Sequence, residues 1–419
     1  MRREGARKMI PTSWTSGSLT GSRSLVFEQF DGRLCIRANG NHAASSGYWQ
    51  SAPVPVASPA LEITTTAECE TEETLTTAKA LVQWNATDGA MLGVDYLLPY
   101  EYGESAHELR LIAEPPPDAA TCTIILLATN VGSATLRWTT PRLTECQALP
   151  SRQVTVASAR LPANRERTIE FNLSQIIPTL AATAEHHPDI VCLPEMCASW
   201  GVEGGPREVA IGRQRILARL AEGAIASGAN VAAAFYEAAA DGQVYNTALL
   251  VDRHGDLIGE YRKTHLTTLE ILGGVQAGTT LDVFGMDVGQ VAIVICWDMW
   301  YPEPLRLASL KHADIVLWPY EQDRHVGHRQ VTARARAMDN GVVIVGSSQV
   351  GPAPIIDDDG NVLAELETEP VYATVEIGRL LSGPRWPQSP PAHQNRRNLT
   401  TGERNASVCE AIATFAQPK

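Results

Sequence analysis

Three residues lie at the ends of predicted strands and could together carry out nucleophilic catalysis. Cys296 comes directly after Val291–Ile295, a run typical of a strand that is buried on both faces. Glu195 and Lys263 also lie at the ends of predicted strands. Because the thiolate is the nucleophilic form of cysteine, a base or a cation must stand near the thiol. If the three side chains meet at one sheet edge, they supply a base, an oxyanion stabiliser and a nucleophile.

The residues after Cys296 predict a short turn and then a helix. Pro302 has the φ of a helix start and lacks the N–H that would be unpaired there, and Glu303 places a negative charge at the positive end of the helix dipole. The thiol would then lie at the carboxyl end of a strand, beside backbone amides that the sheet does not use. On this stretch alone, a buried structural cysteine is an equally good interpretation. Glu195 as a turn cap and Lys263 as a solvated charge are the corresponding alternatives.

Three stretches surround these residues: Leu193-Pro194-Glu195-Met196, Gly259-Glu260-Tyr261-Arg262-Lys263-Thr264-His265-Leu266 and Val294-Ile295-Cys296-Trp297-Asp298. They resemble the three signatures of the nitrilase superfamily of carbon–nitrogen hydrolases. Lys263 lies 68 residues after Glu195, and Cys296 lies 33 residues after Lys263, as in the family. Residues 336–340 resemble its Arg-Ala-x-Glu-Asn segment, with aspartate in place of glutamate. The resemblance covers residues 153–378, and three ordered motifs are far more specific than one.

The resemblance implies a Glu–Lys–Cys site on an αββα sandwich. Glu195 would deprotonate Cys296, which attacks the carbonyl carbon, while Lys263 and the backbone N–H of Trp297 hold the oxyanion. Ammonia or an amine would leave, and Glu195 would then activate water to hydrolyse the thioester. Glu270 resembles the second glutamate that many members place near the lysine, although the match is looser there and a surface charge is the alternative.

The amino-acid sequence of the motifs favours an amide or ureido substrate. Asp298 after Cys296-Trp297, followed by Tyr301-Pro302-Glu303, resembles amidases and N-carbamoyl amidohydrolases such as carbamoylputrescine amidase more than true nitrilases. The alternatives are nitrile hydrolysis, soluble acyl transfer at the same site, and a binding protein with an inactive hydrolase fold. Residues that follow the motifs or strand ends are expected to line the substrate pocket: Trp200, Trp297, Trp300, Tyr301, Tyr320 and Glu321.

Two domains are expected to carry these residues. Residues 23–147 contain short β-branched and aromatic runs between turn clusters, which predicts a two-sheet, jelly-roll-like sandwich. Its Trp49, Trp84 and Trp138 are predicted as core, with a sugar-binding face as the alternative. Residues 152–380 alternate strands with helices, one of which, over residues 168–184, contains Pro178 and is predicted to be kinked or to start later. Residues 1–22 are predicted to be disordered and residues 381–419 to form a tail.

Composition limits the function classes. The chain has 419 residues, 44% hydrophobic residues and a net charge of −13, which argues against a general nucleic-acid or anionic-membrane surface. No apolar run approaches the roughly 18 residues of a membrane span. The eight cysteines show no disulfide or zinc spacing, and no secretory signal is recognised, so a cytoplasmic protein with reduced thiols is expected. No metal or organic cofactor is needed. The family resemblance implies a homodimer or larger homo-oligomer, and the β-sandwich is a candidate for binding a glycan or protein.

Overall fold

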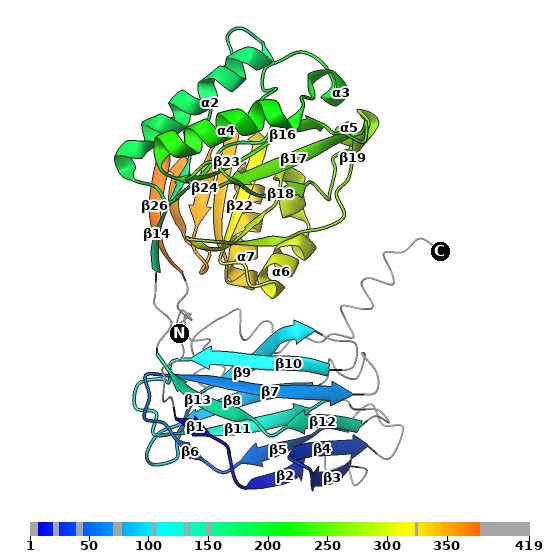
Figure 1. Ribbon diagram of the computed structural model, residues 1–419, viewed down its shortest axis with the longest axis vertical. Helices are drawn as coiled ribbons and strands as arrows, with labels where there is room; N and C mark the ends of the chain where they lie inside the picture. Colours follow the sequence, from blue (N-terminus) through cyan, green and yellow to red (C-terminus); the bar gives the residue numbers. More distant parts are fainter. Residues whose placement is uncertain are drawn as a thin grey trace. The chain divides into compact units, whose positions relative to one another are not determined.

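The computed structural model describes residues 7–19, 25–38, 45–69, 78–102, 106–129, 131, 135–147, 152–322 and 326–377. These residues fall into two compact units, residues 7–147 and residues 152–377. Each unit has its own apolar core, and each is described by itself (Figure 1). The predicted tail, residues 381–419, lies outside the described residues.

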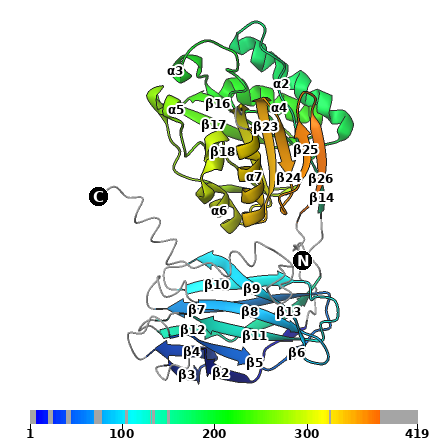
Figure 2. The ribbon, with the colours of Figure 1, turned by 180° about the vertical axis from the view of Figure 1, so that it is seen from behind.

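The first unit is built from strands. They follow one hydrogen-bonded path, β2-β5-β11-β8-β9-β10-β7-β12-β4-β3, in which the long β9 pairs with β8 on one side and β10 on the other (Figures 1 and 2). The strands of this unit are β1 (Lys8–Met9), β2 (Trp14–Ser18), β3 (Leu25–Phe30), β4 (Arg33–Ala38), β5 (Gly47–Ser51), β6 (Val54–Pro55), β7 (Ala60–Cys69), β8 (Ala78–Asn85), β9 (Met91–Tyr102), β10 (Ala106–Ala113), β11 (Thr121–Ala128), β12 (Thr135–Thr139) and β13 (Arg142–Cys146).

One apolar core contains side chains from strands along the whole of this path, because alternate residues of each strand point inward. Trp84 and Trp138 have no exposed surface and Trp49 is 7% exposed. The prediction that these three indoles are core residues is therefore confirmed, and the alternative of a sugar-binding face made by them is wrong. The strand-rich character is confirmed, whereas the jelly-roll class stays a prediction.

The prediction of a disordered N-terminus is wrong for residues 7–19. There β1 pairs with β13 and β2 pairs with β5, both antiparallel. An edge strand gains main-chain hydrogen bonds whatever its side chains are, so its polar sequence is a poor guide to its structure. Trp14 also packs against the core of this unit. Residues 1–6 and 20–22 lie outside the described residues.

The second unit contains two sheets. The first has the order β18-β17-β16-β15-β14-β26, with β19 beside β17, and the second has the order β20-β21-β22-β23-β24-β25. The strands of the first sheet are β14 (Arg152–Ser158), β15 (Ile190–Cys192), β16 (Asn230–Ala238), β17 (Val244–Val251), β18 (Leu257–Arg262), β19 (Val275–Gln276) and β26 (Val371–Ile377). Those of the second are β20 (Val283–Met286), β21 (Gly289–Ile293), β22 (Ile315–Gln322), β23 (Val343–Val350), β24 (Ala353–Ile356) and β25 (Val362–Leu366).

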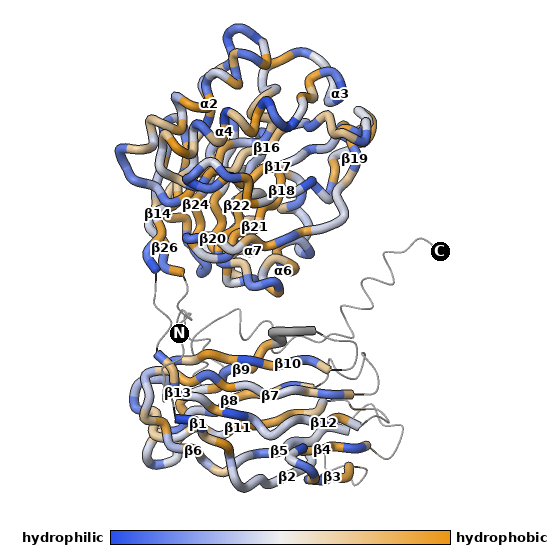
Figure 3. Tube along the Cα trace, in the orientation of Figure 1, coloured by the Kyte–Doolittle hydropathy of each residue, from blue (hydrophilic) through white to orange (hydrophobic). Residues whose placement is uncertain are grey.

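Helices cover both sheets of this unit. α2 (Ile169–Thr183) and α4 (Arg213–Ser227) bury Leu173, Ile176, Leu180, Ile216, Leu220 and Ala224 against the first sheet. α6 (Pro302–Leu310) and α7 (Val326–Asn340) contribute Leu305, Ala308, Ala333 and Ala337 to the core that both sheets share. Figure 3 shows the central strands β21, β22 and β24 as hydrophobic segments inside more polar helices and loops. Two short helices, α3 (Pro206–Val209) and α5 (Thr268–Leu272), complete the set.

The α2 helix runs through Pro178 and begins where the sequence predicts. Thr168 caps it, since its Oγ1 accepts a hydrogen bond from the Phe171 N–H at 3.1 Å. The alternative of a later start is therefore wrong. The free energy gained by packing the apolar face of α2 exceeds the cost of the one hydrogen bond that a proline removes from a helix.

Candidate active site

Glu195, Lys263 and Glu270 form one buried cluster in the second unit. The Lys263 Nζ donates to Glu195 Oε1 at 3.0 Å and to the two oxygens of Glu270 at 3.0 and 2.9 Å. The three residues are 3%, 1% and 4% exposed. Glu195 follows β15 and Lys263 follows β18, so both come from strand ends of the same sheet, as the sequence predicts. The alternatives of a solvated Lys263 and a surface Glu270 are wrong.

A short helix positions Glu270. Glu270 is the third residue of α5, and Thr267 is its N-cap. Thr267 donates its N–H and its hydroxyl to Glu270 Oε2 at 2.8 and 2.9 Å, and the Glu270 N–H donates back to the Thr267 Oγ1. This reciprocal capping box fixes the carboxylate over Lys263. The pattern Thr-x-x-Glu is visible in the sequence, but its meaning depends on where the helix lies.

Asn246, on β17, links the two carboxylates and was not found by sequence reasoning. Its Nδ2 donates to Glu195 Oε1 at 2.7 Å and to Glu270 Oε1 at 2.8 Å, and its side chain is fully buried. The backbone carbonyl of Asn246 also accepts from the Lys263 N–H at 2.9 Å. The only signal in the sequence is one polar residue inside an apolar strand, which identifies no function. Asn246 therefore holds Glu195, Lys263 and Glu270 in one fixed arrangement.

The electrostatics of the cluster keep the lysine charged. Burial lowers the pKa of Lys263, but Glu195, Cys296 and Glu270 raise it, and the net result is a pKa well above the usual range. Lys263 is therefore an ammonium ion at neutral pH. The structure thus brings Glu195, Lys263 and Glu270 into direct contact.

Cys296 stands at a strained turn. The strand that precedes it, β21, ends at Ile293, two residues earlier than the sequence predicts, and residues 296–300 form a 3₁₀ turn. The φ of Cys296 is +43°, in the left-handed region that non-glycine residues rarely adopt, at a cost of roughly 1–2 kcal/mol. The Trp318 indole donates to the Cys296 carbonyl at 3.2 Å. A sharp turn of this kind lifts a side chain out of the sheet toward neighbouring groups.

Asp298 ties the cysteine turn to the lysine loop. Its Oδ2 accepts from the Tyr261 hydroxyl at 2.8 Å and from the Ile295 N–H at 2.9 Å. Its Oδ1 accepts from the Thr264 hydroxyl at 3.1 Å and from the His265 N–H at 2.9 Å, and the His265 Nδ1 lies 3.0 Å away. Asp298 has no exposed surface. His265 is therefore part of the scaffold that holds Asp298.

The predicted pocket residues do not form one group. Trp297 and Trp300 are each 38% exposed, with ring centroids 5.8 Å apart, and Tyr301 is 37% exposed and stacks on His265 at 4.1 Å. Trp297 and Trp300 belong to the Cys296 turn and Tyr301 follows it, and all three rings are partly exposed. Glu321 is half-buried.

Two other predicted pocket residues lie elsewhere. Tyr320 has no exposed surface, donates to the Pro352 carbonyl at 2.7 Å and packs on Trp318, so it is a core residue. The prediction that it lines the substrate pocket is corrected, because its residue type and strand-end position do not reveal its burial. Trp200 lines a separate cavity, whose twelve lining residues include none of Glu195, Lys263, Glu270 and Cys296.

In the part of the chain that the structure describes, no group of three or more histidine, cysteine, aspartate or glutamate side chains is arranged to hold a metal ion. None of the helices among the described residues is long and apolar enough to cross a membrane.

Comparison with known proteins identifies relatives of the second unit. The carbon–nitrogen hydrolase family model matches residues 155–382, more than half of the chain. A deaminated glutathione amidase from Synechocystis sp. is 31% identical over 158 residues, which cover 32% of this chain and 58% of that protein. An omega-amidase described as chloroplastic, from Arabidopsis thaliana, is 27% identical over 177 residues, which cover 38% of this chain and 48% of that protein. The chain thus spans about half the length of these curated relatives.

A solved structure shares the fold. The NitN amidase from Neterenkonia sp. AN1 superposes with a TM-score of 0.51 at 20% identity, covering 62% of this chain and 99% of that one. At this identity the likeness concerns the fold alone. The family match, the fold and the three motifs at strand ends agree with one another. This chain therefore belongs to the carbon–nitrogen hydrolase family, within the nitrilase superfamily.

Proposed function

We propose that the protein hydrolyses a non-peptide C–N bond in a small amide or an N-carbamoyl compound. An amide and water would give a carboxylate and ammonium, and an N-carbamoyl amine and water would give the amine, carbon dioxide and ammonia. The observation that carries the proposal is the buried Glu195–Lys263–Glu270 cluster, whose lysine loop Asp298 ties to the Cys296 turn. A carboxylate, an ammonium and a thiol together are the groups that acyl transfer through a thioester requires.

Each residue has one role in this proposal. Glu195 takes the thiol proton, and the Cys296 sulfur attacks the carbonyl carbon to give a tetrahedral oxyanion. The Lys263 ammonium and the Trp297 N–H stabilise that oxyanion until the C–N bond breaks and Glu195 returns the proton to the leaving nitrogen. Glu195 then deprotonates a water molecule, which attacks the thioester and releases the thiolate. No metal or organic cofactor enters any step.

Glu270 and Asn246 support these steps as positioning residues. Glu270 makes two hydrogen bonds to Lys263 and so holds the ammonium in place, while Asn246 donates to both carboxylates. A charged network in which every member is bonded is rigid, and rigidity at this site preserves the geometry of attack. Trp297, Trp300 and Tyr301 would contact the substrate; in support of this, they follow Cys296 in the chain and are partly exposed.

The test is ammonia release from a panel of amides, N-carbamoyl amines and nitriles. The wild type should release ammonia from at least one amide or carbamoyl compound, and Cys296→Ala should release none. The control is Cys146→Ser, which changes a partly buried cysteine of the other unit and should keep full activity. Carbon dioxide formed together with ammonia would identify a carbamoyl substrate. Turnover of nitriles alone, or an active Cys296→Ala, would refute the proposal.

The remaining features are proposed with it. The two sheets and their helices are proposed to form the four-layer αββα sandwich of the family, over residues 152–380, and residues 23–147 a jelly-roll-like sandwich that binds a glycan or protein. A cytoplasmic location is proposed from the eight cysteines, which show no disulfide framework spacing, and a homodimer is proposed from the family resemblance. Light scattering on the full chain tests the dimer, and a monomer at working concentration would refute it.

A further inference from the structure

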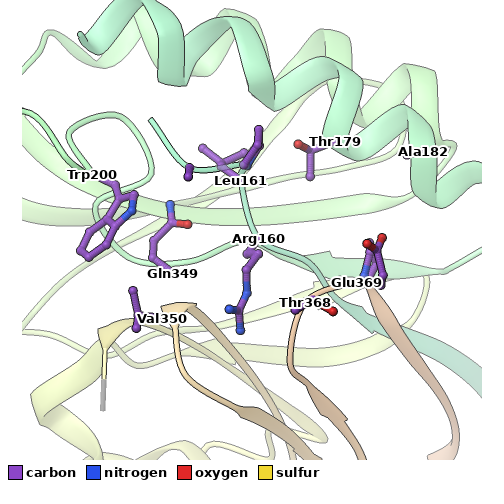
Figure 4. A pocket seen from close by; sticks show the side chains of 12 residues that line it. Arg160, Leu161, Thr179, Ala182, Trp200, Gln349, Val350, Thr368 and Glu369 are labelled. Carbon is purple, nitrogen blue, oxygen red and sulfur yellow. The ribbon is translucent and has the colours of Figure 1, made fainter. Parts of the chain in front are cut away.

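The cavity that contains Trp200 has the features of a ligand site. Its volume is about 600 Å³. It is bounded by the loop after β14, helix α2, the turn after β15, the end of β23 and the β25–β26 connection (Figure 4). The side chains that line it are Arg160, Leu161, Pro162, Ala163, Thr179, Ala182, Trp200, Gln349, Val350, Thr368, Glu369 and Pro370. A cavity of this size can hold a small organic molecule.

Gln349 is the most informative residue of this cavity. Its side chain is only 6% exposed, and neither its Nε2 nor its Oε1 has a hydrogen-bond partner among the described residues. Figure 4 shows the Gln349 side chain between the Trp200 indole and Arg160. Buried amide groups are almost always hydrogen-bonded, because an unpaired one costs the free energy of its desolvation. An amide with an unused donor and an unused acceptor at a cavity wall is suited to a ligand that offers both.

Arg160 adds a positive charge to the same wall. Its Nη2 donates to the carbonyls of Gly351 and Leu366 at 2.5 and 3.3 Å, which fixes the guanidinium. Its Nε is buried without a partner, and no carboxylate in the described part of the chain pairs with it. Burial lowers the pKa of Arg160, as expected for a cation that lacks a counter-ion. A fixed, unpaired guanidinium is the usual recognition group for a carboxylate.

The remaining lining residues of the cavity include apolar side chains in its interior and solvent-exposed residues at its rim. Leu161, Trp200 and Val350 offer hydrocarbon and aromatic surface, whereas Thr368 and Glu369 are exposed at the rim. Because the rim is exposed, a ligand can enter from solvent. The combination of a cation, an amide and apolar surface is typical of small-molecule sites, in which a few polar groups fix the orientation.

We propose that this cavity binds a small carboxylate that carries a neighbouring N–H group and an apolar substituent, the chemistry of an N-acyl amino acid. The carboxylate would accept from the Arg160 Nε–H and the Gln349 Nε2, and the ligand N–H would donate to the Gln349 Oε1. The apolar substituent would lie against Trp200 and Leu161. A neutral amide would leave Arg160 without a counter-ion. The inference does not depend on the proposed catalytic roles, because none of those residues lines the cavity.

The test is calorimetric titration of the full-length Cys296→Ala protein, in which binding is measured without turnover. Three probes differ in one group each: N-acetylleucine, its methyl ester, which lacks the free carboxylate, and 4-methylpentanoate, which lacks the acetamido group with its N–H. N-acetylleucine is expected to bind at least tenfold more tightly than either of the others. Equal affinity for the ester, or no binding of N-acetylleucine at millimolar concentration, would overturn the proposal.

Variants locate the binding in this cavity. In the Cys296→Ala background, Gln349→Met keeps the side-chain length and removes both polar atoms, and N-acetylleucine binding should fall at least tenfold. This variant is expected to fold, because replacing an unpaired buried polar group by an apolar one of similar shape is neutral or stabilising. Gln175→Met, on the partly exposed side of α2, is the matched control and should bind normally. Normal binding to Gln349→Met would place the ligand elsewhere and overturn the proposal.

Discussion

Asp298→Asn tests whether one buried carboxylate holds the cysteine turn and the lysine loop together. The substitution keeps the shape of the side chain but leaves one oxygen instead of two. With that oxygen at the Oδ1 position, the new amide group would face the Ile295 N–H, which now donates to Oδ2 at 2.9 Å. With the opposite orientation, the Thr264 hydroxyl and the His265 N–H would lose their acceptor. Either orientation leaves at least one buried N–H unpaired.

The expected loss of stability follows from the number of hydrogen bonds that the substitution removes or weakens. An unpaired buried donor costs about 1–3 kcal/mol, and the hydrogen bonds that remain change from charged to neutral, which weakens each by about 1 kcal/mol. The expected loss of stability of the second unit is therefore roughly 3–5 kcal/mol. For a unit of this size, such a loss corresponds to a melting temperature lower by roughly 6–15 °C. We also expect kcat/KM to fall at least tenfold, because the turn that holds Cys296 is no longer tied to the loop that holds Lys263.

The assay combines differential scanning calorimetry with ammonia release. Asp282→Asn is the matched control, because Asp282 is 57% exposed and makes only an ion pair with Lys311 among the contacts described for it. That control should melt like the wild type, since exposed ion pairs contribute little. A melting temperature of Asp298→Asn within about 1 °C of the wild type would refute the reasoning that the hydrogen bonds of this carboxylate hold the two segments together.

Three further substitutions test other parts of the structure. Asn246→Leu removes the side-chain donors that lie 2.7 and 2.8 Å from the carboxylates of Glu195 and Glu270. We expect kcat to fall at least tenfold and the melting temperature to change less than for Asp298→Asn. An unchanged kcat would contradict the positioning role. Asp95, which accepts from the Trp84 indole, has its pKa raised by burial from 3.8 to about 7, so between about pH 4 and pH 7 it is neutral in the folded protein and ionised in the unfolded chain. The free energy of unfolding therefore falls by about 4 kcal/mol as pH rises from about 4 to about 7. Asp95→Asn should flatten this pH dependence in melts between pH 5 and 8. Melting curves of the variant that depend on pH as those of the wild type do would contradict the prediction. Gly278→Ala would place a Cβ 2.1 Å from the Arg262 carbonyl oxygen, so the backbone there must move. Calorimetry should show a free energy of unfolding lower by more than about 2 kcal/mol. A variant that melts like the wild type would contradict this expectation.

Local pattern was sufficient to predict most elements of the second unit. The α2 helix lies within one residue of its predicted range, 168–184, because apolar periodicity and capping residues act over a few neighbours. In the first unit, β1 and β2 lie in residues that were predicted to be disordered. Polar edge strands have no clear local signal.

The position of each catalytic candidate at a strand end could also be predicted, but its environment could not. Trp200 and Tyr320 were both expected in the substrate pocket, yet one lines a different cavity and the other is core. Asn246 could not be found, since a single asparagine in a strand indicates nothing until its neighbours are known. Which side chains meet across a sheet depends on strand order, and strand order is set by packing between segments far apart in the chain.

By itself, the sequence determined the two-part organisation, the family and the three residues Glu195, Lys263 and Cys296, because each of these rests on short-range patterns and ordered motifs. Only the tertiary structure decided that Glu270 and Asn246 complete the buried cluster and that Asp298 joins its two loops. The tertiary structure also decided that Gln349 and Arg160 face a cavity with unpaired polar atoms. Burial and hydrogen-bond partners are properties of the packed chain, so they appear only when distant segments lie together.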